Sequence, residues 1–263
     1  DRTMSPDEFG VAMAREFEKK VEELGADKIA AFVGEPVQGA GGVIIPPDTY
    51  WPEIQRICNE HGILLVTDEV ICGFGRLGEW FGADYYGVKP DLMTFAKAVT
   101  SGYLPLGGVM VGDRVGDVLI EKGGEFYHGY TYSGHPASCA VAIENLRIIQ
   151  REQLVERARD DIGPYLRERW ATLREHPLVG ETRMIGMMGA FELVKNQETL
   201  ERFDEDDGVG TICRDFLVNN GLVMRAVGDT IVTAPPLTMS RAQVDEQIDK
   251  AWKCLDLTQK AIS

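Results

Sequence analysis

The sequence predicts an α/β fold, in which a mostly parallel sheet is flanked by helices. Three observations favour it: the apolar runs are short, they are apolar on both faces, and helical stretches separate them. The runs occupy residues 29–33, 63–67 and 92–96, and each predicts a strand covered by helices on both sides. A fourth run, Gly108–Val111, predicts a neighbouring strand.

The first predicted element is a helix that begins at Pro6 and ends near Gly25. Ser5 is suited to be its N-cap, and Glu8 completes a capping box with that serine. Apolar side chains then recur at helical spacing along the segment. A second helix is predicted over residues 50–61, before the second apolar run.

The C-terminal part of the chain reads as a mixture of helices and strands. Helical patterning runs from Pro136 to Arg174, with a break near Arg151. The later predicted elements are a strand with glycine interruptions over 184–194, a helix over Val209–Asn219, a hairpin over 223–232 that turns at Gly228 and Asp229, and a helix over 240–256. We therefore expect a sheet-bearing large domain in residues 1–150 and a smaller α+β domain in residues 151–263.

Charge and cysteine spacing exclude several classes of protein. The 263 residues carry a formal net charge of −15, which argues against non-specific binding to nucleic acid. The five cysteines lack the close pairs of zinc sites or redox motifs, and so predict reduced thiols and a cytoplasmic location. No apolar stretch is long enough to predict a membrane span. The chain begins with Asp1 rather than Met, and we expect further sequence before it.

Charged residues follow three of the predicted strands. Glu35 comes after the first strand, Asp68 after the second and Lys97 after the third. Taken singly, each charge is explained as a solvated strand end. Together they predict a site, because ligands bind outside the carboxyl ends of parallel strands. An acid and a lysine suit pyridoxal phosphate, since a carboxylate keeps the ring nitrogen protonated and a lysine holds the aldehyde as a Schiff base.

Four longer segments carry a family resemblance. They are Gly34-Glu-Pro-Val-Gln-Gly-Ala-Gly-Gly42, Thr67-Asp-Glu-Val-Ile-Cys-Gly-Phe-Gly-Arg76, Phe95-Ala-Lys-Ala98 with Ser101-Gly102 and Pro105-Leu-Gly-Gly108, and His128-Gly-Tyr-Thr-Tyr-Ser-Gly-His-Pro136. In order and spacing they resemble the signature of the class III, pyridoxal-phosphate-dependent aminotransferases. The resemblance covers essentially the whole chain. It implies a fold type I enzyme, of which this chain is the catalytic and C-terminal portion.

The resemblance implies roles for the residues around the cofactor. Asp68 matches the partner of the ring nitrogen, Val70 the side chain packed on the ring face, and Lys97 the lysine that forms the imine. Thr131 resembles the threonine that binds the cofactor phosphate across a dimer interface, with Tyr130 beside it, so a homodimer or a higher homo-oligomer with a shared site is implied. Without the motifs, Val70 would be explained as core packing and Thr131 as a turn hydroxyl.

Further matches concern the substrate. Glu35 corresponds to a glutamate near the cofactor ring, where it can assist the ring electrostatics or order its neighbours. Ala40 stands where relatives that act on ornithine or 4-aminobutyrate have a second glutamate, and Ile71 stands where they have a glutamine. Ile71 is also expected to contact the cofactor. Both differences favour the branch that resembles ω-amine:pyruvate transaminases. Arg225 resembles the mobile arginine of that branch, which binds the acceptor carboxylate; its alternative is an exposed strand arginine.

The implied reaction moves an amino group from an amine or ω-amino acid to pyruvate or a similar 2-oxo acid, through a Schiff base on Lys97. An aminomutase or a decarboxylating transaminase of the same family is an alternative. So is a non-catalytic fragment, because relatives have an N-terminal region that supplies a phosphate loop and an aromatic ring for the cofactor. No metal site is predicted, since His128 and His135 have no acid or cysteine pattern beside them.

Overall fold

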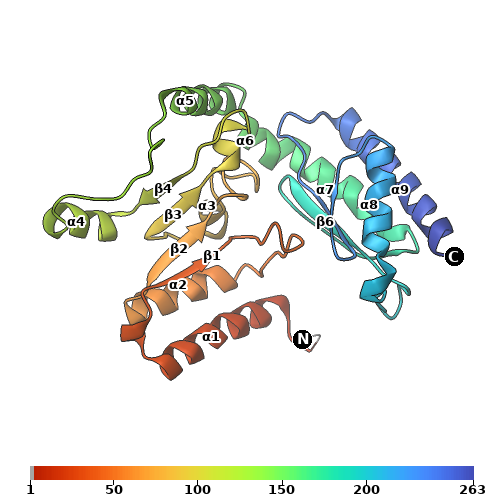
Figure 1. Cartoon of the computed structure of the whole chain (residues 1–263). Coiled ribbons are helices and arrows are strands. Elements are labelled where there is room, and N and C mark those ends of the chain that lie inside the picture. Colours follow the sequence, from red (N-terminus) through yellow and green to blue (C-terminus); the bar gives the residue numbers. More distant parts are fainter. Residues whose placement is uncertain (1–2) are drawn as a thin grey trace. The chain divides into compact units, whose positions relative to one another are not determined.

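The computed structural model describes residues 3–263, which form two compact units (Figure 1). Unit 1 comprises the residues up to Val37 together with Pro46–Phe74 and Glu79–Gln153, and unit 2 comprises Gln38–Ile45, Gly75–Gly78 and Leu154–Ser263. The sequence predicted a boundary near residue 151. In the structure, two short segments that precede this boundary, Gln38–Ile45 and Gly75–Gly78, also belong to unit 2.

The sheet of unit 1 is mixed and mostly parallel. Its strands, in spatial order, are β1 (Ala31–Gly34), β2 (Leu64–Asp68), β3 (Leu92–Phe95) and β4 (Gly108–Val111). β2 pairs in parallel with both β1 and β3, whereas β4 is antiparallel to β3. The predicted α/β class is confirmed, and β4 occupies the residues expected for it.

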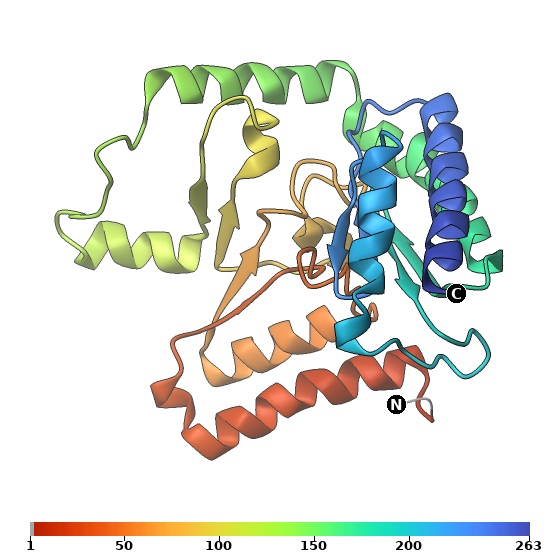
Figure 2. The ribbon, with the colours of Figure 1, turned by 45° about the vertical axis from the view of Figure 1, so that its right-hand side comes forward.

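Unit 1 also contains helices that precede and follow its strands. They are α1 (Pro6–Leu24), α2 (Tyr50–His61), α3 (Gly82–Tyr86), α4 (Asp113–Lys122) and α5 (Pro136–Arg151). The capping box of α1 is confirmed, because the Ser5 hydroxyl accepts from the backbone N–H of Glu8 and the Glu8 carboxylate accepts from that of Ser5. α1 packs beside α2, and Figure 2 shows the pair from a second direction. α3 and α4 were not predicted from the sequence.

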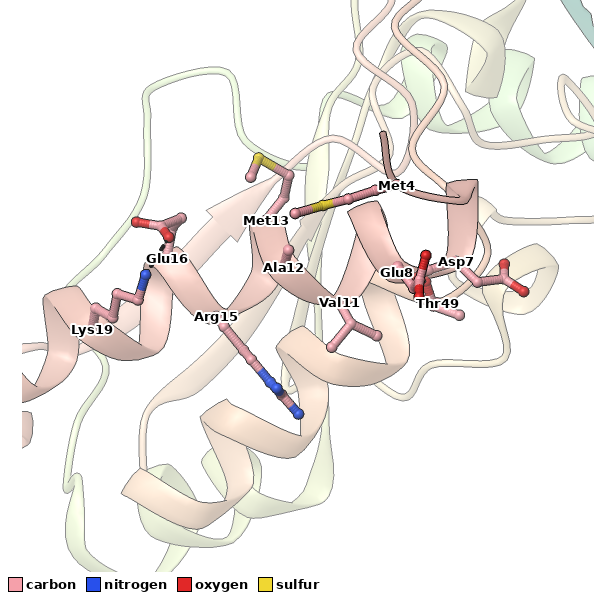
Figure 3. A pocket seen from close by; sticks show the side chains of 10 residues that line it. All are labelled: Met4, Asp7, Glu8, Val11, Ala12, Met13, Arg15, Glu16, Lys19 and Thr49. Carbon is pink, nitrogen blue, oxygen red and sulfur yellow. Dashed lines mark hydrogen bonds and ion pairs between the residues drawn. The ribbon is translucent and has the colours of Figure 1, made fainter. Parts of the chain in front are cut away.

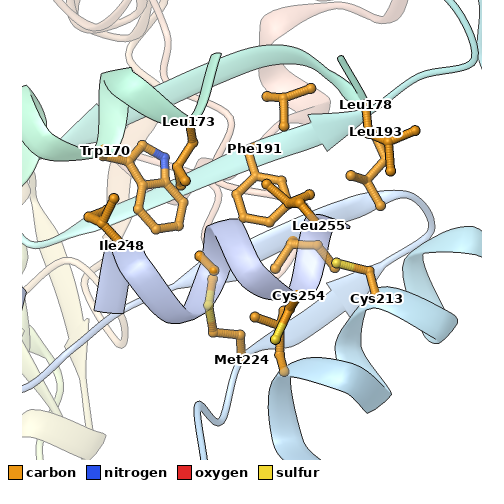
Figure 4. Close-up of a cluster of buried hydrophobic side chains, with 14 of the residues drawn as sticks. Trp170, Leu173, Leu178, Phe191, Leu193, Cys213, Met224, Ile248, Cys254 and Leu255 are labelled. Atoms are coloured by element: carbon orange, nitrogen blue, oxygen red, sulfur yellow. The ribbon is translucent and has the colours of Figure 1, made fainter. Parts of the chain in front are cut away.

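Unit 2 contains an antiparallel sheet covered by helices. The strand order is β5 (Val179–Ile185), β6 (Met188–Leu193), β8 (Thr230–Thr233) and β7 (Arg225–Val227). The helices are α6 (Leu154–Arg157), α7 (Gly163–Ala171), α8 (Val209–Asn219) and α9 (Arg241–Ile262). A closely packed core that includes Trp170, Phe191 and Leu255 lies between sheet and helices (Figure 4).

The prediction of one strand over 184–194 was wrong, because the chain turns back at Gly186 to form the β5–β6 hairpin. Gly186 has φ +51, and a Cβ there would lie 2.4 Å from the Arg76 carbonyl oxygen, so both the turn and the close approach require glycine. The residues around it are apolar and buried, which removed the polar signature of a turn. The hairpin predicted at Gly228 and the helix Val209–Asn219 are confirmed.

The remaining elements are short. They are the 3₁₀ turns Ala26–Lys28, Lys97–Thr100, Thr172–Glu175 and Glu205–Asp207 and the π segment Ala158–Ile162. Through residues 3–263, none of the helices has the length and hydropathy that crossing a bilayer requires.

Candidate active site

The carboxyl ends of three neighbouring strands carry the predicted site residues of unit 1. Asp68 is the last residue of β2 and lies opposite Thr94 of β3, while Gly34 at the end of β1 lies opposite Thr67. Glu35 therefore follows directly on β1, and Lys97 lies just beyond the end of β3. The parallel register thus brings the three charged residues to the same edge of the sheet, as the sequence predicted.

The Asp68 carboxylate is anchored to its own strand and to the next one. Its Oδ1 accepts hydrogen bonds from the backbone N–H of Val70, at 3.0 Å, and from the Thr94 hydroxyl, at 3.1 Å. Throughout the described chain, the hydrogen bonds found to this half-buried carboxylate end on Oδ1. Oδ2 is therefore the oxygen suited to a ligand N–H.

Lys97 lies in a backbone conformation that non-glycine residues rarely adopt. Its φ is +46, and its side chain is exposed. The turn that follows is held by Asn145 of α5, whose Nδ2 donates to the carbonyls of Ala98, at 2.8 Å, and Val99, at 3.1 Å. Ser101, also at positive φ, donates its hydroxyl to Asn145 Oδ1 at 2.8 Å. Because strained backbone persists where its surroundings fix it, this turn is a candidate for function.

The loop that bears Glu35 is held from two sides. The Trp51 indole Nε1 donates to the Pro36 carbonyl at 3.0 Å, and the Cys72 thiol donates to the Val37 carbonyl at 3.3 Å. Burial raises the pKa of Cys72 to about 12, so this thiol is an inert packing group rather than a nucleophile. Glu35 itself is half-buried at the start of the loop.

The other predicted residues lie in three different places. Val70 and Ile71 are half-buried and follow Asp68 after one intervening residue, Glu69. Tyr130 and Thr131 are exposed, in a turn between α4 and α5 where the Tyr130 N–H donates to the Ser133 hydroxyl at 2.9 Å. Arg225 begins β7 in unit 2 and is exposed.

A recess of about 700 Å³ in unit 1 lies along α1 (Figure 3). It is lined by α1 side chains such as Met13 and Lys19, by Met4 and by Thr49. None of the site residues predicted from the sequence lines it. Over residues 3–263, no cluster of three or more histidine, cysteine or acidic side chains is arranged to hold a metal ion.

The strand-end geometry can be compared with that of known proteins. The family model described as Aminotransferase class-III matches residues 4–255. The chain belongs to the class III aminotransferases. This confirms the resemblance drawn from the four motifs, and with it the fold type I architecture.

Several relatives are similar to this class III chain over nearly its whole length. The putrescine–pyruvate aminotransferase of Pseudomonas aeruginosa is 58% identical, over 98% of this chain and 56% of the relative. The diaminobutyrate–2-oxoglutarate transaminase of Halomonas elongata is 43% identical, over 99% of this chain and 56% of the relative. A solved (S)-enantioselective ω-transaminase from Thermomicrobium roseum superposes with a TM-score of 0.92 at 45% identity, over 97% of this chain and 57% of that one. The chain thus spans little more than half the length of these relatives.

Pyridoxal phosphate is the cofactor of this family, and the residues at the sheet edge fit it. Asp68 offers a carboxylate held on one oxygen, and Lys97 exposes a primary amine on the neighbouring strand end. Val70 adds an apolar side chain two residues after the aspartate. A carboxylate, an amine and an apolar contact are the groups that a pyridine aldehyde requires.

Sequence reasoning missed the residues that hold this edge in place. Thr94 and Asn145 act through partners 26 and 47 positions away, so no local pattern marks them. Glu69 was noted only as part of a motif, yet it is buried completely. A glutamate directly after a strand-end aspartate was the signal that could have identified it.

Proposed function

We propose that this chain supplies the lysine-bearing part of the active site of a pyridoxal-phosphate-dependent aminotransferase. The protein would move an amino group from an amine or ω-amino acid to pyruvate or a similar 2-oxo acid. The observation that carries the proposal is the pair of adjacent strand ends, one with an anchored carboxylate at Asp68 and the other with an exposed amine at Lys97. In this proposal, unit 1 is part of the cofactor-binding large domain and unit 2 is the small domain.

When bound, pyridoxal phosphate supplies an electron sink for the carbon that carries the amino group. Asp68 Oδ2 holds a proton at the ring nitrogen by accepting its N–H, with the carboxylate oriented by Thr94. Lys97 Nζ would hold the cofactor at its aldehyde carbon, and as a free amine it would be the base that takes a proton from the substrate carbon. Val70 and Ile71 would supply apolar contacts to the ring, and Glu35 would order the groups beside it.

The acceptor site is proposed from the differences at Ala40 and Ile71 together with Arg225. An exposed guanidinium at Arg225 suits a carboxylate, because it presents two parallel N–H donors. The similar aminotransferase of Pseudomonas aeruginosa makes putrescine and pyruvate the first substrates to test. Formation of alanine from pyruvate, dependent on the amine and on pyridoxal phosphate, is the expected result. An isomerised amine would instead favour an aminomutase, and released carbon dioxide a decarboxylating transaminase. The absence of any reaction would favour the non-catalytic alternative.

We further propose a homodimer in which Tyr130 and Thr131 bind the cofactor phosphate of the partner subunit. The support is an exposed apolar surface on β4, α4 and residues 123–135, where Ile120 is 84% exposed and Tyr127 is 87% exposed. Monomeric proteins seldom expose so many large apolar side chains close together. Sedimentation at micromolar concentration should show a dimer, and Ile120→Asp with Tyr127→Ser should shift it to a monomer that binds the cofactor more weakly.

The proposed location is the cytoplasm. All five cysteines are free, and four of them are buried, which suits a reducing compartment. Localisation of the tagged protein by fractionation tests this proposal.

A further inference from the structure

Glu69 is a completely buried carboxylate next to the candidate site. It follows Asp68, and its exposed fraction is 0%. Its Oε2 accepts from the backbone N–H of Gly82, at 2.8 Å, and its Oε1 from that of Ala83, at 2.7 Å. Both oxygens are thus used to tie the end of β2 to the first two residues of α3.

The start of α3 in turn packs on the loop that bears Glu35. A Cβ at Gly82 would lie 2.5 Å from Cβ of Pro36, so the Gly82 backbone meets the proline ring there without room for a side chain. Pro36 is the residue after Glu35, and its carbonyl is already fixed by Trp51. The position of Glu35 therefore depends on where Glu69 holds α3.

The backbone of Glu69 is joined to the same residue that anchors Asp68. Its N–H donates to the Thr94 carbonyl at 2.9 Å, while the Thr94 hydroxyl donates to Asp68 Oδ1 at 3.1 Å. Asp68, the last residue of β2, and Glu69 after it are thus both bound to one residue of β3. A shift of Glu69 would be transmitted to the Asp68 carboxylate through Thr94.

A carboxylate at this position is not explained by packing. Burial raises the pKa of Glu69 to about 7, which means that the ionised form is costly there. An apolar residue would avoid that cost but would leave the Gly82 and Ala83 N–H groups without an acceptor. A glutamine has a single acceptor oxygen, and its NH₂ group would face the second N–H donor.

We propose that Glu69 is a positioning residue, which sets the direction of the Asp68 carboxylate and the place of Glu35 by tying β2 to α3. This inference rests on the proposed pyridoxal phosphate site. It assigns no contact between Glu69 and the cofactor. The effect of Glu69 on the cofactor must therefore pass through Asp68 or through Glu35, and that dependence can be measured.

The test compares Glu69→Gln with Asp84→Asn in the full-length protein. Asp84 also accepts a backbone N–H at the start of α3, from Phe81 at 3.1 Å, but from the exposed side. We expect Glu69→Gln to weaken pyridoxal phosphate binding by on the order of tenfold, because one buried N–H loses its acceptor and the strand end shifts. Asp84→Asn should leave the affinity within about twofold, although it removes a capping carboxylate of the same helix.

A double-mutant cycle with Asp68→Asn identifies the route. If Glu69 acts through Asp68, Glu69→Gln should change the cofactor affinity and the absorption spectrum of the bound cofactor little further in the Asp68→Asn background. Equal losses from Glu69→Gln and Asp84→Asn, or additive losses with both Asp68→Asn and Glu35→Gln, would overturn the inference. Should Glu69→Gln not fold, Glu69→Asp, which keeps both oxygens on a shorter side chain, enters the same cycle. A wild-type protein that binds no pyridoxal phosphate would instead refute the proposed function.

Discussion

Thr94 donates its hydroxyl to Asp68 Oδ1 at 3.1 Å and so joins the ends of two parallel strands through their side chains. One residue earlier on β2, the Thr67 hydroxyl is buried at 0% exposure and has no hydrogen-bond partner within residues 3–263. Thr94 of β3 and Thr67 of β2 thus differ in whether their hydroxyl makes a hydrogen bond.

Replacing Thr94 by valine should loosen the Asp68 carboxylate. We expect a loss of about 1 kcal/mol in the free energy of unfolding and a fall of about fivefold in pyridoxal phosphate affinity. Thr67→Val is the matched control, because it removes an unused hydroxyl and should leave stability unchanged or raise it by up to about 1 kcal/mol. Chemical denaturation and cofactor titration of both variants check this, and equal losses of affinity would contradict it.

Asn145 should determine the order of the turn that bears Lys97. Asn145→Ala leaves the carbonyls of Ala98 and Val99 without their donor, at an expected cost of about 1–3 kcal/mol. Hydrogen exchange of the amides in residues 97–104 should quicken, and capture of the cofactor should slow. Ser101→Ala removes only the bond to Asn145 Oδ1 and should have a smaller effect. Unchanged hydrogen exchange in Asn145→Ala would show that the turn does not depend on the hydrogen bonds from Asn145.

His176 should make unit 2 less stable in mild acid. The side chain is buried, its Nδ1 accepts from the Leu178 N–H at 3.2 Å, and burial lowers its pKa from 6.5. The folded state binds the proton of His176 less well than the unfolded state does. The contribution of neutral His176 to the free energy of unfolding is therefore complete above pH 6.5 and is lost as the pH falls through the lowered pKa. The melting temperature of the wild type should therefore fall more between pH 7.5 and 5.5 than that of His176→Gln. An equal fall in the melting temperatures of the two proteins would exclude this role.

Arg183 should hold the loop that carries Ala40. Its Nε donates to the Val43 carbonyl at 2.9 Å and its Nη2 to the Gly42 carbonyl at 2.7 Å, beside a valine with φ +55. Arg183→Met keeps much of the side-chain volume but none of the donors, and should cost about 1–3 kcal/mol. Faster hydrogen exchange in residues 39–44 is the expected signature, with Arg183→Lys intermediate because lysine lacks the planar array of donors.

The sequence predicted what depends on local patterns. Ser5 and Glu8 marked the start of α1, and the strand ends at Asp68 and Lys97 followed from apolar runs and their flanking charges. It did not predict contacts between distant segments, such as those of Thr94 and Asn145, because no spacing rule links partners that meet only after folding. α4 was also not predicted, although apolar side chains recur along it at helical spacing; none of its residues is buried.

The site residues themselves came from matching whole motifs rather than from physics alone. Glu35, Val70 and Thr131 have ordinary explanations when each is taken singly, as a strand end, a packed side chain and a turn hydroxyl. The structure adds the hydrogen bonds that hold Asp68 and the turn after Lys97. The roles of these residues toward cofactor and substrate stay predictions.

Covalent capture of the cofactor tests the central claim most directly. The protein, loaded with pyridoxal phosphate and reduced with borohydride, should carry the cofactor on Lys97, as found by mass spectrometry of its peptides. Lys97→Ala should carry none and should lose turnover. Labelling of another lysine, or full activity in Lys97→Ala, would contradict the account.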